Sequence, residues 1–169
     1  MNISPSLLFV SLFIANTSAF AAPTPTAGLK FEATISMALA EEAAREAVAN
    51  CATKGYQVAA TVVDKAGDIK ALFRADGAGP HTIDASRRKA YTAASAKNGT
   101  SAMLATSQSN PAAQNLGQID GFLLLGGGLP IRAGSIVIGA IGVGGAPGGP
   151  LDDQCAQAGI DKIKDRIGN

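Results

Sequence analysis

Apolar and small side chains recur with helical spacing in four parts of the chain. This pattern predicts helices, which cover residues 35–53, 83–97, 101–107 and 151–167. Thr34 and Thr82 directly precede the first two segments. Both are suitable N-caps, because a threonine hydroxyl can accept a hydrogen bond from a free amide of the first helical turn.

Five other segments are rich in β-branched or continuous apolar residues and predict strands. They are residues 56–64, 69–75, 121–127, 129–134 and 135–145. Residues 65–68 join the first two as a hairpin turn. The third and fifth strands are apolar almost throughout, so we expect both faces of the sheet to be covered. The order of elements predicts an α+β domain built on an antiparallel five-stranded sheet flanked by helices.

The N-terminal residues have the pattern of a targeting segment rather than of a fold. An apolar run ends at residues 19–21 in a small-x-small sequence, as at a signal-peptidase site, and is too short for a membrane span. We therefore predict a signal peptide at 1–21, a flexible lead-in at 22–33 and the domain at 34–169. The predicted location is the periplasm or the outside of the cell.

Charge and composition exclude several classes of partner. The net charge is +1, and the chain has no Trp. Nucleic acids and membrane surfaces usually require a basic excess, and single strands require stacking aromatics. We expect neither kind of partner.

The two cysteines, Cys51 and Cys155, leave two interpretations open. In an oxidising compartment an even pair indicates a disulfide. The alternative is two buried thiols that behave as small apolar side chains.

Standard catalytic motifs are missing from the sequence. The glycines of GVGGAPGGP, at 142–150, do not complete G-x-G-x-x-G or a Walker loop. No G-x-S-x-G sequence positions a serine, and a single histidine excludes a multi-histidine zinc site within one chain. We assign no catalytic residue and leave open whether the protein is an enzyme, with a binding protein favoured.

The segment DGAGPHTIDASRRKAYTA, at 76–93, is the best candidate for a ligand site. It holds the chain's one histidine, His81, followed by Arg87, Arg88, Lys89 and Tyr91. An imidazole beside cations and an aromatic ring suits a planar ligand that carries carboxylates, and haem is such a ligand. The alternative is a histidine with only a structural role at a helix entry.

Four stretches carry a more specific signal: TVVDKAGDIKALFRADGAGP, SRRKAYTA, GFLLLGGGLPI and IGAIGVGGAPGGPLDDQCAQAGI. Together they resemble the GlcG/HbpS family, also called the haem-degrading or DUF336 domain, from about Thr34 to the end of the chain. The resemblance implies a profilin- or PAS-like fold, homo-oligomers that are often octamers, and haem binding in some secreted members. The family's basic segment matches Arg88 and Lys89, and its threonine loop matches Thr100.

The leading hypothesis is an exported protein that binds haem b for sensing, storage or scavenging. Its candidate site residues are His81, Arg88, Lys89, Tyr91, Thr100 and Met103. His81 is the predicted iron ligand, and the basic side chains are predicted to hold the propionates. One alternative is an enzyme or accessory factor that acts on a small carboxylated metabolite. The other is an oligomeric partner of a membrane sensor such as a sensor kinase.

Overall fold

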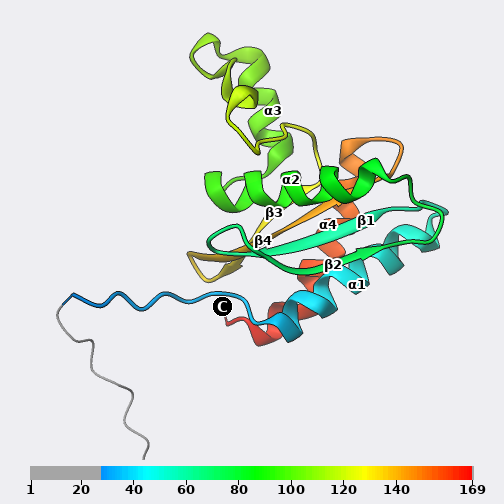
Figure 1. Ribbon diagram of the computed structural model, residues 1–169, viewed down its shortest axis with the longest axis horizontal. Coiled ribbons are helices and arrows are strands. Elements are labelled where there is room, and N and C mark those ends of the chain that lie inside the picture. Colours follow the sequence, from blue (N-terminus) through cyan, green and yellow to red (C-terminus); the bar gives the residue numbers. More distant parts are fainter. Residues whose placement is uncertain (1–27, 169) are drawn as a thin grey trace, which may run out of the picture. The chain divides into compact units, whose positions relative to one another are not determined.

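A four-stranded antiparallel sheet is the centre of the fold (Figure 1). The computed structural model describes residues 28–168, so the predicted signal peptide and the first half of the predicted lead-in lie outside the described residues. The strands have the spatial order β2-β1-β4-β3. Their bounds are β1 Ala59–Asp64, β2 Ile69–Arg74, β3 Gly128–Ala133 and β4 Ile136–Gly144.

Helices cover both faces of this sheet (Figure 1). Helices α1 (Met37–Thr53) and α4 (Gly149–Ile163) lie on one face, and α2 (His81–Ala96) lies on the other. Helix α3 (Thr100–Ser109) and the short 3-10 helices η1 (Pro111–Ala113) and η2 (Leu116–Gln118) extend beyond α2. The α+β class with helices on both faces of an antiparallel sheet is confirmed, whereas the profilin- or PAS-like likeness stays a prediction.

The prediction of a fifth strand at 121–127 is wrong. The segment forms no strand: side chains bind several of its backbone groups, and its last residue, Gly127, accepts through its carbonyl from the Val143 amide of β4 at 2.8 Å. The Leu123 amide donates to Thr92 Oγ1 at 2.9 Å, and the Gly127 amide donates to Asp153 Oδ1 at 2.6 Å. Arg88 donates to the carbonyl of Phe122. The apolar run is therefore a loop fastened to α2 and α4.

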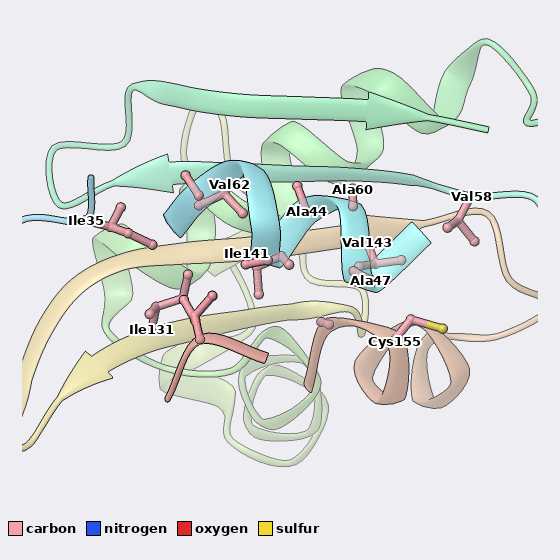
Figure 2. Packing of buried hydrophobic residues seen from close by; sticks show 14 of the residues in the cluster. Ile35, Ala44, Ala47, Val58, Ala60, Val62, Ile131, Ile141, Val143 and Cys155 are labelled. Atoms are coloured by element: carbon pink, nitrogen blue, oxygen red, sulfur yellow. The ribbon is translucent and has the colours of Figure 1, made fainter. Parts of the chain in front are cut away.

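The main core lies between the sheet and the pair α1 and α4 (Figure 2). Alanines of α1 face aliphatic side chains of the strands. The central buried residues are Ala44, Ala47, Val58, Ala60, Val62, Ile131, Ile141 and Val143. A smaller cluster joins α2 to the other face through Val63, Ala90, Ala93, Ala94 and Ala140. Small side chains on the helices permit close approach to the sheet.

Two glycines show why this part of the sequence is rich in that residue. A Cβ on Gly142 of β4 would lie 2.1 Å from the carbonyl oxygen of Ser86 in α2. A Cβ on Gly159 of α4 would lie 2.4 Å from the carbonyl oxygen of Ala43 in α1. Both contacts are too short for any side chain, so glycine allows the helices to lie directly against their neighbours.

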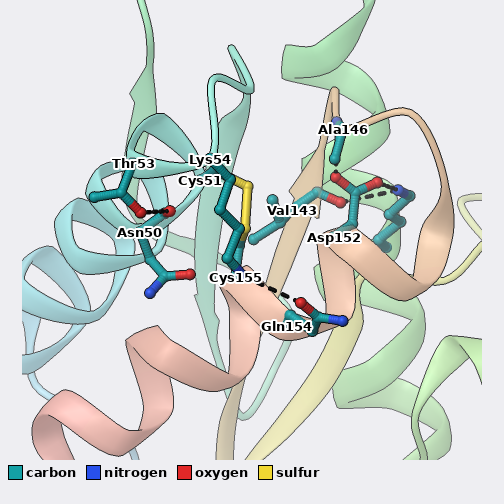
Figure 3. The surroundings of a disulfide bond; sticks show 10 residues. Asn50, Cys51, Thr53, Lys54, Val143, Ala146, Asp152, Gln154 and Cys155 are labelled. Atoms are coloured by element: carbon teal, nitrogen blue, oxygen red, sulfur yellow. Dashed lines mark hydrogen bonds and ion pairs between the residues drawn. A yellow bond between two sulfur atoms is a disulfide. The ribbon is translucent and has the colours of Figure 1, made fainter.

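A disulfide joins α1 to α4 inside the main core (Figure 3). Cys51 and Cys155 are bonded, with their Cα atoms 5.5 Å apart, and both residues are fully buried. Among residues 28–168, no helix is long and apolar enough to cross a membrane.

Neither of the two threonines predicted as N-caps caps its helix. Ser36 caps α1 by accepting from the Leu39 amide, while Thr34 donates to the carbonyl of Ile138. Helix α2 begins at His81, so Thr82 lies inside it and donates to the carbonyl of Gly79 at 2.7 Å. Helix α4 begins two residues before the predicted start and ends at Ile163, where η3 (Lys164–Arg166) follows.

Candidate functional site

A cleft of about 470 Å³ opens where the start of α2, the first turns of α3 and the start of α4 meet. Its apolar wall comes from α2, α3, the 121–127 loop, the loop before α4 and the first turn of α4: Ala85, Leu104, Leu125, Ala146 and Pro150. Its polar side chains are His81, Lys89, Ser101 and Asp152. A mostly apolar cleft with few polar groups is typical of a small-molecule site.

His81 is the first residue of α2 and borders this cleft. Its side chain is exposed, and the ring lies close to Gly79, where a Cβ would come within 2.8 Å of Cε1. Within the part of the chain that the structure describes, no hydrogen bond or ion pair engages the imidazole. A free ring nitrogen in such a position can coordinate a metal.

A buried ion pair forms the inner end of the cleft. The Lys89 ammonium lies 2.8 Å from Asp152 Oδ2 and donates to the carbonyl of Val143 at 2.9 Å. The other oxygen of Asp152 accepts from the Ala146 amide at 3.0 Å, as Figure 3 shows. Burial raises the pKa of the Asp152 carboxyl, while attraction to Lys89 and the hydrogen bonds act in the opposite direction.

The next residue, Asp153, binds the 121–127 loop and α3, which also border the cleft. Its Oδ1 accepts from the Gly127 amide, and its Oδ2 accepts from the hydroxyl of Ser101 in α3. Two consecutive carboxylates in the first turns of α4 therefore fasten α2, α3 and both loops that border the cleft. The structure therefore gives both aspartates a part in organising the cleft.

Two of the predicted site residues point away from the cleft. Arg88 donates to the carbonyl of Phe122 in the 121–127 loop. The Tyr91 ring packs edge-on against Phe122, with 6.3 Å between ring centroids. It also covers two turns, since a Cβ at Gly67 or Gly121 would lie 2.7 or 3.1 Å from its ring carbons. Neither side chain borders the cleft.

Two more predicted residues are buried beside the site. Thr100 Oγ1 accepts from the Gly128 amide at 2.9 Å and so joins the start of α3 to β3. Met103 is 5% exposed. Neither borders the cleft. Of the six predicted residues, the structure therefore brings only His81 and Lys89 together in one cleft.

Sequence reasoning missed Ser101, Leu104, Leu125 and Asp152. Their signal is weak, because they come from three separate parts of the chain, namely α3, the 121–127 loop and α4, and none belongs to a local motif. Within residues 28–168 there is also no group of three or more His, Cys, Asp or Glu side chains that could hold a metal ion.

The structure is an α+β domain with a mostly apolar cleft, the candidate small-molecule site, where the starts of α2, α3 and α4 meet. A family model described as "Haem degrading protein HbpS-like" matches residues 35–161. The chain belongs to this HbpS-like family, as the sequence motifs predicted.

Individual relatives agree with this assignment. The chain is 35% identical over 117 residues, 67% of its length and 81% of the relative's, to an uncharacterised 15.0 kDa protein of the dhaT-dhaS intergenic region in Citrobacter freundii. A double mutant of HbpS from Streptomyces reticuli is 38% identical, with a TM-score of 0.75 over 83% of this chain and 96% of that one. The crystal structure of a PduOC–haem complex shares the fold, with 24% identity and a TM-score of 0.71 over 77% of this chain and 95% of that one.

Proposed function

We propose that this protein is an exported haem-binding protein that holds haem b in the cleft, with His81 as the iron ligand. The observation that carries the proposal is the free, exposed imidazole beside an apolar cleft. Membership of the HbpS-like family and the haem in the PduOC complex support the choice of ligand.

The cleft residues fit the chemistry of haem. The volume of the cleft lies within the range of roughly 300–1,000 Å³ that is usual for small-molecule sites. Leu104, Leu125 and Pro150 offer an apolar surface to a macrocycle, and glycines on the opposite side leave room beside the backbone. Bound haem would supply an iron whose reactivity depends on its axial ligands and on the polarity of the site.

Each residue has a separate part in this proposal. His81 binds the iron, and Lys89 is favoured over Arg88 as the cation near the ligand, because Arg88 is turned to the Phe122 carbonyl. Thr100 and Met103 are buried, and Tyr91 faces two turns. We therefore favour water or His81 of a second protomer as the other axial ligand.

A rival function rests on the pair of Lys89 and Asp152. A cation at the inner end of a cleft could receive the carboxylate of a small metabolite, and the protein would then be an enzyme or an accessory factor. Haem titration of the purified mature protein separates the two proposals. A saturable Soret shift at one haem per protomer supports haem binding, and its absence supports the rival.

Export and assembly belong to the proposal as well. The predicted signal peptide and the disulfide support a place outside the cytoplasm.

The chain's own helices cover both faces of the sheet, so a homo-oligomer, for example an octamer, needs other surfaces. Ile119 and Leu125, 47% and 50% exposed, are candidates. Light scattering that shows a monomer of about 15 kDa would contradict assembly. Partnership with a sensor kinase stays a proposal that pull-down from membranes can test.

A further inference from the structure

The turn between α2 and α3 contains a reactive arrangement outside the cleft. Asn98 is exposed, and its Oδ1 accepts a hydrogen bond from the amide of the next residue, Gly99, at 2.8 Å. This contact places the Gly99 nitrogen beside the side-chain carbonyl of Asn98. Within residues 28–168 the Gly99 amide has no other acceptor, because Gly99 precedes the first residue of α3.

We propose that Asn98 is a site of spontaneous succinimide formation and deamidation in the folded protein. The Gly99 nitrogen attacks Asn98 Cγ, a new C–N bond forms, and the bond from Cγ to Nδ2 breaks. Ammonia leaves with the proton of the attacking amide. Water then opens the imide at one of its two carbonyls and yields aspartate or isoaspartate. The net change is asparagine plus water to an acid plus ammonia, so no oxidant or cofactor is needed.

The fold does little to prevent this reaction. Attack at Asn98 breaks no helical hydrogen bond, since the Gly99 amide donates only to the side chain that it would attack. Gly99 has no Cβ to crowd the ring that forms. The neighbouring backbone is held from both sides, because Arg132 donates to the carbonyl of Lys97 at 2.7 Å and the Thr100 hydroxyl binds Gly128. Neither contact engages the Asn98 side chain or the Gly99 amide, so both reacting groups remain available.

The two products differ in their effect on the fold. Aspartate adds a negative charge just before α3, where the helix dipole favours it. Isoaspartate instead adds a main-chain carbon directly before Gly99 and Thr100. The first turns of α3 carry Ser101 and Leu104 of the cleft, so this product shifts one cleft wall. The modification is thus an ageing reaction that changes the surroundings of the site.

Asn115 provides a matched control within the same molecule. It is also exposed, but Leu116 follows it and its Oδ1 accepts from the Gln118 side chain. The experiment incubates folded protein without any ligand in mildly alkaline buffer and follows both asparagines by peptide mass mapping. We expect Asn98 to convert at least about tenfold faster than Asn115, which corresponds to about 1.4 kcal/mol of activation free energy.

A variant and an unfolded sample complete the test. Gly99→Ala retains an ordinary φ of −68°, and its Cβ would meet Leu129 Cδ2 at an unstrained 3.5 Å. We expect it to fold and to slow conversion at Asn98. Equal rates at Asn98 and Asn115 would overturn the proposal. So would rapid conversion in urea together with a stable Asn98 in folded protein, since the fold would then protect the site. Because no ligand takes part, these outcomes leave the haem proposal untouched.

Discussion

Asp152→Asn tests the role of the buried ion pair in building the cleft. The side chains of Lys89 and Asp152 are 5% and 4% exposed, and their charged atoms lie 2.8 Å apart. An asparagine has nearly the same shape but no charge, and one amide oxygen cannot serve both the Lys89 ammonium and the Ala146 amide. Breaking a buried pair by neutralising one partner costs about 3–5 kcal/mol, because the other charge stays buried.

Urea denaturation at fixed protein concentration measures this loss in the free energy of unfolding. Asp84→Asn is the matched control, since Asp84 and Arg87 form an equally short pair, at 2.7 Å, whose side chains are 61% and 40% exposed. Such an exposed pair contributes only about 0.2–1 kcal/mol. A loss below about 1 kcal/mol in Asp152→Asn would refute the reasoning, since it would mean that the buried charges do not depend on each other.

Lys89→Met adds a pH signature to the same test. Burial already raises the pKa of Asp152 above its ordinary 3.8, and removal of the ammonium raises it further. A carboxyl with a raised folded-state pKa binds its proton more tightly when folded. The stability that this carboxyl contributes is therefore fully present at pH values below its pKa in the unfolded chain. It is lost as the pH rises through its pKa in the folded protein. We expect Lys89→Met to lose stability relative to wild type as pH rises above about 4.

The remaining predictions concern the disulfide and the packing of α2. Exported protein that is denatured without reductant should show no free thiol on titration, and two free thiols would contradict the disulfide. Replacing Cys51 and Cys155 by alanine should lower the free energy of unfolding by about 4 kcal/mol, because the disulfide closes a long loop. Gly142→Ala should cost at least about 1–3 kcal/mol by denaturation, because its Cβ would overlap the Ser86 carbonyl. Gly148→Ala, whose Cβ would meet Pro150 Cδ at 3.8 Å, should change stability by under about 0.5 kcal/mol, and equal losses in the two variants would show that the contact with α2 is unimportant.

The parts of the fold that sequence predicts well are those set by local pattern. Helical spacing identified α1, α2, α3 and α4, and the hairpin signal identified β1 and β2. The segment at 121–127 failed because an apolar run shows no sign of what binds its backbone. Its partners, Thr92 and Asp153, lie about thirty residues away, and only the folded chain brings them close.

The site was harder to predict for the same reason. His81 and Lys89 could be found because they belong to one short segment with unusual chemistry. Asp152 is 63 residues from Lys89, and nothing in its local sequence indicates that the two are paired. The cap of α1 shows the same limit on a small scale: Thr34 is a sound local candidate, but it binds the distant carbonyl of Ile138 instead.

The central claim is that His81 ligates haem iron in this cleft, and the absorbance spectrum of haem-loaded His81→Ala tests it most directly. The account predicts a changed ligand-field spectrum and a haem dissociation constant raised more than tenfold. A tenfold rise corresponds to a loss of about 1.4 kcal/mol in binding free energy. Arg87→Ala, which removes an exposed cation from the same helix, should leave both unchanged. A wild-type spectrum and affinity in His81→Ala would contradict the account and would make this histidine a structural residue at the start of α2.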